Sequence, residues 1–191
     1  HDDTDGIDLT SNDDYIRTYR YSWYDKAHRV TDSANYGTNN SAGWKDNSTA
    51  PTYGASAPSR SDTVLVSTYN WNADGYRDKT TDPKAIGTLS TFDALGRVTQ
   101  KDEADATVDE RITKYEFNGQ GSLTKITADL TADQVTEYVY ADSVSAGLVT
   151  KIRYPDPSTG AASDAAVDTI QMTYNVDGTQ ATRTDQNGTT Q

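Results

Sequence analysis

The sequence predicts an all-β protein built from stacked antiparallel β-hairpins. Three observations support this fold class: a short motif that returns along the chain, residues that alternate with period two on either side of it, and the absence of a convincing helical pattern. Each hairpin is too small to bury its apolar face alone, so neighbouring hairpins are expected to form one sheet.

The repeated motif pairs an aromatic residue with a Gly four positions later. Two positions after the Gly slot comes Val or Leu in most copies, and Thr follows it. Two copies depart from this spacing at the Gly slot: the copy at Tyr24 has His28 there, and the copy at Tyr140 reaches Gly147 only after three extra residues. The pairs are Trp71 with Gly75, Phe92 with Gly96, Phe117 with Gly121, Tyr174 with Gly178, Tyr24 with His28, and Tyr140 with Gly147.

The residue types of the motif indicate a tight turn between two strands. Asp93 follows Phe92 directly, and an Asx side chain accepts hydrogen bonds from the backbone just beyond it. Gly96 supplies a positive φ at low cost. Before the next turn, Thr113, Tyr115 and Phe117 alternate with charged residues, which is typical of a strand.

Two regions follow from this pattern. Residues 1–61 are expected to hold an acidic connector, one degenerate hairpin around Tyr24 and a long Gly/Ser/Asn-rich loop over 32–61. Residues 62–191 are expected to be a hairpin array that continues beyond the C-terminus. Within it, Thr127–Gln134 is predicted to connect two strands, and Pro155–Asp168 to form a second loop.

The octapeptide Phe92-Asp93-Ala94-Leu95-Gly96-Arg97-Val98-Thr99 resembles the YD repeat of the RHS family, which includes bacterial RHS toxins, toxin-complex shells and teneurins. The segment Tyr24–Thr31 departs from it only at His28. Thr81-Asp82-Pro83 and Thr184–Gly188 look like the turns that join one hairpin to the next. The resemblance implies a YD-repeat sheet or a segment of a spiral β-shell, in which Tyr24, Phe92, Phe117, Tyr140 and Tyr174 pack between neighbouring hairpins.

Composition narrows the function. Ile, Leu, Val and Phe make up only about 14% of the chain, so the 13 Tyr and 3 Trp must supply much of the burial. A net charge of −12 disfavours nucleic acid as a partner. The longest aliphatic run is Val64-Leu65-Val66, so membrane insertion is not expected, and the absence of Cys excludes disulfides.

The sequence does not predict a catalytic or a metal site. The chain has two His, and His28 stands in a turn slot, since His tolerates a positive φ better than most residues. We therefore expect no enzyme activity and no cofactor. Asn70, Asn72 and Asp74 have the spacing of a calcium loop, but position 81 is Thr instead of the bidentate Glu. The same residues also suit the turn of the repeat, and we favour that interpretation.

The expected function is a non-catalytic structural module of a large secreted or cell-surface protein, forming part of a β-shell or an extracellular fibre or adhesin. Its partners would be neighbouring YD repeats or identical subunits. The alternative is a glycan- or receptor-binding module that uses the 32–61 loop, where Trp44 is the candidate platform for a sugar face.

Overall fold

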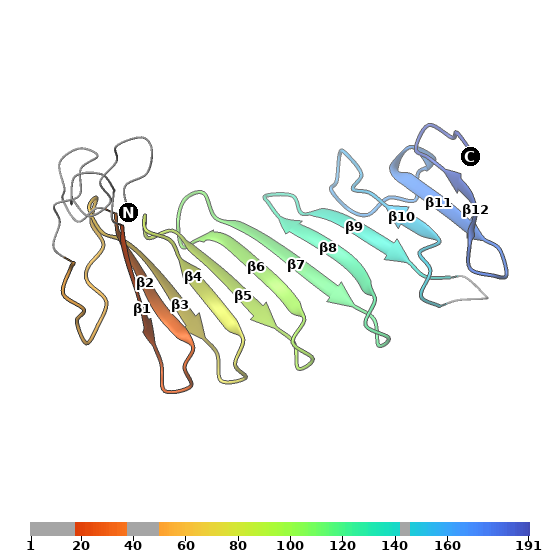
Figure 1. The fold of residues 1–191 in the computed structure, drawn as a ribbon. Coiled ribbons are helices and arrows are strands. Elements are labelled where there is room, and N and C mark those ends of the chain that lie inside the picture. Colours follow the sequence, from red (N-terminus) through yellow and green to blue (C-terminus); the bar gives the residue numbers. More distant parts are fainter. Residues whose placement is uncertain (1–17, 38–49, 142–145) are drawn as a thin grey trace, which may run out of the picture. The chain divides into compact units, whose positions relative to one another are not determined.

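The computed structural model describes residues 18–37, 50–141 and 146–191, and within them the chain is almost entirely β-structure (Figure 1). The strands form a sheet of 12 strands whose order follows the sequence, and the neighbours whose register is defined are antiparallel. The helical content of these residues is one 3₁₀ turn, Ala166–Asp168. The predicted all-β class with stacked hairpins is confirmed.

The chain divides into two compact units, 1–88 and 89–191, and the boundary expected from composition at residue 61 stays a prediction. The N-terminal unit holds the strands β1 (Tyr19–Tyr24), β2 (Val30–Gly37), β3 (Leu65–Trp71) and β4 (Arg77–Thr81). Strand β5 (Gly87–Phe92) spans the division. The C-terminal unit holds β6 (Val98–Asp105), β7 (Arg111–Phe117), β8 (Leu123–Asp129), β9 (Gln134–Val139), β10 (Lys151–Arg153), β11 (Thr169–Tyr174) and β12 (Gln180–Thr184).

The core of the N-terminal unit is small and lies on one face of its strands. Trp23, Ala34 and Val66 are buried there, with exposed fractions of 6%, 0% and 3%. The segment that precedes β3 packs against this face: the Tyr53 ring stacks on Trp23 with centroids 5.2 Å apart, and the Trp23 indole donates a hydrogen bond to the Gly54 carbonyl. Aromatic side chains therefore supply the burial that the scarce aliphatic residues cannot.

Residues 32–37 were predicted as loop, and the prediction was wrong because they complete β2. Tyr36 is the one strand former among these mostly polar residues, but β2 is hydrogen-bonded between β1 and β3 on both sides. Ala34 pairs with Tyr21 and Val66, which places its small side chain in the core. Tertiary pairing outweighs weak strand propensity here.

The C-terminal unit has few buried side chains. Ile170 is its one buried hydrophobic residue among those described, and Asp102, Thr127 and Thr169 are its buried polar ones. Thr127 lies inside β8, which continues to Asp129, so the connection to β9 is shorter than the predicted Thr127–Gln134 segment. A sheet this open leaves much of both faces accessible.

The second loop is ordered by contacts with the β8–β9 turn. The Val135 amide donates a hydrogen bond to the Gly160 carbonyl at 2.8 Å, and the Gly160 amide donates to the Asp156 carbonyl at 2.8 Å. Gly160 has a φ of +74°, and a Cβ placed on it would lie 2.0 Å from the Asp133 carbonyl oxygen. The close approach of two backbones explains why Gly occupies this position.

Candidate functional site

The turns of the repeat are held by one carboxylate or amide oxygen each. In the turn after β5, Asp93 Oδ1 accepts hydrogen bonds from the amides of Leu95 and Arg97 at 2.9 and 3.0 Å. Gly96 then takes a φ of +79°. The same arrangement recurs with Asn118 and Asp25, where His28 fills the Gly slot at a φ of +62°.

The turns that join one hairpin to the next use this device too. Asp82 Oδ1 accepts from the amides of Lys84 and Ile86, and Ala85 takes the Gly slot with a φ of +67°. Asp185 makes the equivalent bonds in the last turn. The two segments identified from the sequence as joining turns therefore have the same backbone geometry as the motif turns.

An arginine links the turn to the aromatic residue of the next hairpin. Arg97 donates from Nε and Nη2 to Asp93 Oδ2, both at 2.6 Å, and its guanidinium lies over the Phe117 ring, 4.4 Å from the centroid. The hydrogen bond from the Arg97 side chain holds the pKa of Asp93 below its ordinary value. The guanidinium is thereby fixed by the turn of one hairpin and covers the ring of the following one.

Arg29 makes the corresponding contacts in the N-terminal unit. It pairs with Asp25 Oδ2 at 2.7 Å and lies 5.2 Å from the centroid of the Trp71 ring. The Arg29 amide, followed by its side chain, lowers the pKa of Asp25. The motif's Asp and Arg therefore act together across two hairpins.

The aromatic residues also donate hydrogen bonds to the preceding hairpin. Each bond ends on the carbonyl two positions after the Gly slot, which is the Val or Leu of the motif. We call these bonds the seam. They run from Trp71 Nε1 to Val30 O at 2.9 Å, from Tyr140 Oη to Leu123 O at 2.7 Å, and from Tyr174 Oη to Val149 O at 2.7 Å.

Phe117 has no donor, and the stacked Arg97 takes over at that position. Tyr24 differs from the expected packing, because its side chain is 60% exposed. No strand is described before β1, so Tyr24 has no preceding carbonyl of this kind among the described residues. Phe92 ends β5, and Gly121 and Gly178 have φ values of +90° and +81°. Gly147 is a described turn residue two positions after residues 142–145, which lie outside the described ranges.

The other candidate sites are placed as follows. Trp44 lies outside the described residues. Asn72 Oδ1 accepts a hydrogen bond from the Tyr76 amide, as the turn interpretation requires, while Asn70 is in β3 and Asp74 is exposed. In the part of the chain that the structure describes, no helix is long and apolar enough to cross a membrane.

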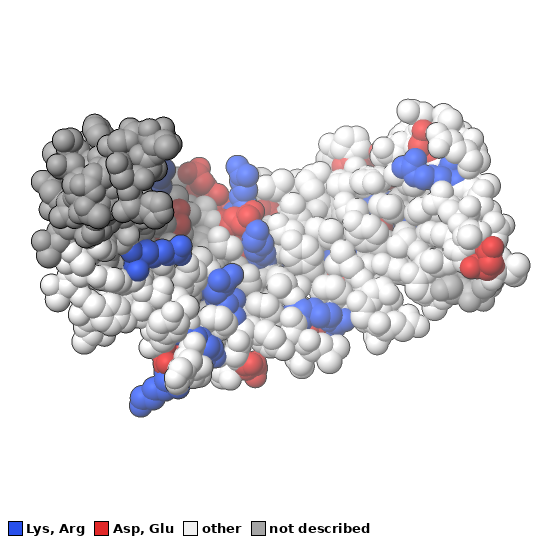
Figure 2. Space-filling model, viewed as in Figure 1, with Lys and Arg blue, Asp and Glu red and all other residues white. Residues whose placement is uncertain are grey.

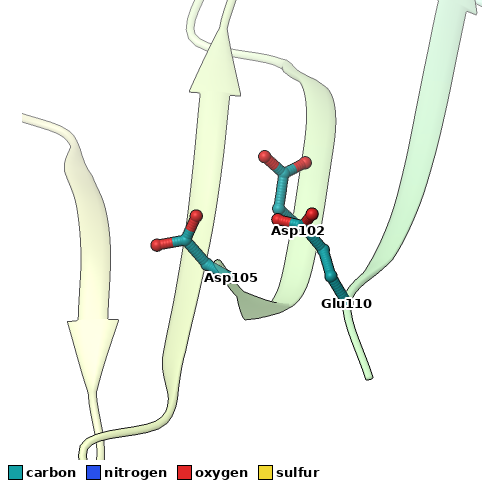
Figure 3. Close-up of side chains that lie close together, drawn as sticks. All are labelled: Asp102, Asp105 and Glu110. Atoms are coloured by element: carbon teal, nitrogen blue, oxygen red, sulfur yellow. The ribbon is translucent and has the colours of Figure 1, made fainter. Parts of the chain in front are cut away.

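An acidic cluster at the turn from β6 to β7 was not predicted from the sequence. Asp102, Asp105 and Glu110 each place a carboxylate oxygen within 4.8 Å of the others (Figure 3). Asp102 is 7% exposed and accepts a hydrogen bond from Gln100, and Glu110 accepts one from the Ala106 amide. These protein donors account for two of the three groups, and we assign the cluster no function.

Comparison with known proteins shows similarity only at the level of the fold. No family model matches the chain, and no curated protein matches it. Solved structures of toxin complexes do: TcdB2-TccC3-TEV aligns with a TM-score of 0.54 and 13% identity over 84% of this chain. TcdB2-TccC3 without its hypervariable C-terminal region gives 0.52 and 14% over 84%, and the Tc holotoxin pore of Photorhabdus luminescens gives 0.51 and 13% over 82%.

The chain spans 7% of the length of each of these proteins. At this identity the likeness concerns the β-sheet fold alone. It is consistent with the resemblance to YD repeats noted from the motif and identifies the chain as similar to a small β-sheet segment of a much larger protein.

Proposed function

We propose that this chain is a non-catalytic structural segment of a large secreted or cell-surface YD-repeat protein. It extends a β-shell or an extracellular fibre by adding hairpins to a continuous sheet. Its partners are the neighbouring repeats of the same protein or identical subunits.

The observation that carries this proposal is the seam. Trp71, Tyr140 and Tyr174 each bond to a carbonyl of the preceding hairpin at the same motif position. A repeated contact between successive units, in place of one central core, is the arrangement of proteins whose stability is a sum of nearest-neighbour interfaces.

The thin core supports the same conclusion. In the C-terminal unit, Ile170 is the one buried hydrophobic residue among those described, and the strand residues are mostly half-buried or exposed. Sheet faces this open are suited to being covered by further layers or subunits of a larger assembly.

Electron microscopy of the parent protein tests the proposal. We expect the hairpins of this chain to continue a sheet that either encloses a cavity or extends as a fibre. An isolated domain tethered by linkers would contradict it. The absence of enzyme activity is tested separately: a catalytic activity of the purified chain that is lost in His28→Ala would overturn the non-catalytic part.

A further inference from the structure

The N-terminal unit has a pocket on the face opposite its core. Ser22 and Ser33 are adjacent in sequence to the core residues Trp23 and Ala34, so their side chains point to the other face of β1 and β2. On that face, residues of β1–β4 and of the turn after β1 line an open pocket of about 410 Å³. This volume is in the range of sites for small molecules and sugars, roughly 300–1,000 Å³.

Three arginines line the pocket, and no Asp or Glu is among its lining residues. Arg20 donates from Nε to Ser33 Oγ at 2.9 Å, and the Arg77 guanidinium lies over the Tyr69 ring at 5.4 Å. Arg20 and Arg77 are both exposed. Among the residues that the structure describes, Arg29 is the one arginine of the three that has a carboxylate partner, Asp25.

The three arginines give this pocket a positive charge, although the net charge of the whole chain is −12. Figure 2 shows Lys and Arg side chains over the strands of the N-terminal unit, with Asp and Glu side chains among them. Two guanidiniums that have no carboxylate partner in the described ranges attract an anionic group, and the planar fork of Arg suits a carboxylate or a sulfate in particular.

The other lining residues indicate which chemical class of ligand fits the pocket. The side chains offer hydrogen-bond donors and hydroxyls, and the rings of Tyr69 and Trp71 add apolar surface. The Trp71 indole N–H is already bonded to Val30 O. The ligand should therefore be rich in acceptors and hydroxyls and have an apolar face, which describes a sugar ring bearing an acidic group.

Other anionic ligands fit less well. Nucleic acid is disfavoured by the net charge. A peptide in extended form needs backbone partners, and the central strands β2 and β3 that floor the pocket are paired with strands on both sides. A single small anion leaves most of the pocket unfilled.

We infer that the β1–β4 face of the N-terminal unit binds an acidic saccharide, bearing a uronate or a sulfate, through Arg20 and Arg77. This site is distinct from the Trp44 loop considered from the sequence. It does not depend on whether the parent protein is a shell or a fibre.

The test is calorimetric titration of the 191-residue chain at low ionic strength. The probes are a uronate oligosaccharide, a sulfated oligosaccharide and a neutral oligosaccharide of equal length. We expect binding of at least one acidic probe and none of the neutral one. The double variant Arg20→Gln/Arg77→Gln should weaken binding about tenfold or more, because it removes both guanidiniums that would hold the acidic group.

Arg183→Gln is the control, because it removes a half-buried arginine from β12, whose residues do not line the pocket. It should bind like the parent chain. Arg77→Gln alone is a second variant, in which the described contact that is lost is the one between the guanidinium and the Tyr69 ring. An unchanged circular dichroism spectrum verifies that each variant is folded.

Four results would overturn the inference: equal binding of the neutral probe, no binding of either acidic probe, equal loss in Arg183→Gln, or equal affinity for inorganic sulfate or a poly-aspartate peptide. The last would mean that the pocket recognises charge alone. A selective loss in both Arg77→Gln and the double variant supports the acidic saccharide.

Discussion

Replacing Gly160 by Ala tests whether the second loop is locked onto the β8–β9 turn by backbone contact. The added Cβ would lie 2.0 Å from the Asp133 carbonyl oxygen and 2.7 Å from the Gln134 side-chain amide. Backbone atoms cannot rotate away as a side chain can. The loop must therefore shift, and the hydrogen bond from the Val135 amide to the Gly160 carbonyl is lost with it.

Gly178→Ala is the matched control. Gly178 has a φ of +81°, close to the +74° of Gly160, but a Cβ there would meet nothing within 4 Å. It should cost only the left-handed backbone strain, about 1 kcal/mol. Ala85 shows that the same turn slot accepts Ala, with a φ of +67°.

Gly160→Ala adds two costs to that strain. Forced displacement in a packed contact costs about 1–3 kcal/mol, and the lost hydrogen bond about 1 kcal/mol. The expected destabilisation is therefore about 3–5 kcal/mol for Gly160→Ala against about 1 kcal/mol for Gly178→Ala. For a chain of this size each kcal/mol lowers Tm by about 2–4 °C.

Thermal and urea unfolding of the two variants measure the difference. Hydrogen exchange adds a local readout, because the Val135 amide should exchange faster in Gly160→Ala and stay protected in Gly178→Ala. If the two variants unfold at the same midpoint with Val135 equally protected, the close approach of the loop and the turn is refuted.

Three further predictions concern the motif itself. Tyr174→Phe removes one seam bond and should lower the free energy of unfolding by about 1 kcal/mol, whereas the same change at exposed Tyr24 should have little effect; urea midpoints compare them. Asp93→Asn keeps an acceptor for the turn amides but loses the ion pair with Arg97, so it should be less destabilising than Asp93→Ala. The Arg97 hydrogen bond lowers the pKa of Asp93 from 3.8. The ion pair therefore stabilises the fold above pH 3.8, and this stabilisation is lost as the pH falls through the lowered pKa. Asp93→Asn removes the ion pair, so the difference between its free energies of unfolding at neutral and at acid pH should be smaller than in the parent chain. Asn72→Asp should not confer calcium-dependent stabilisation if this segment is only a turn, and a rise in Tm with millimolar calcium would contradict that interpretation.

The sequence was sufficient to predict the hairpins, because their turn chemistry is local. Asp93, Gly96 and even His28 could be assigned from neighbours within four positions. Strand 32–37 could not, since it is held by β1 and β3 on either side and its own residues carry no strand pattern.

The contacts between hairpins could not be predicted from the sequence either, because they join residues that are far apart in the chain. Arg97 and Phe117 are twenty positions apart, and nothing in the motif says which ring an arginine will cover. The seam acceptor is a backbone carbonyl, which every residue has, so the amino-acid type at that position does not reveal the bond. The pocket lined by Arg20, Arg29 and Arg77 combines residues of four strands and a turn, so only the fold brings it together.

The seam also gives the array a direction. Each of the three seam rings reaches backward to the hairpin that precedes it, and the acceptor is a main-chain carbonyl, present whatever side chain occupies that place. A new hairpin therefore needs only its own aromatic residue to join the growing end, and requires no matching change in its predecessor. Duplication or loss of whole hairpins, and insertions such as the loop after β10, can accumulate in such a chain without breaking the rule by which successive units recognise each other.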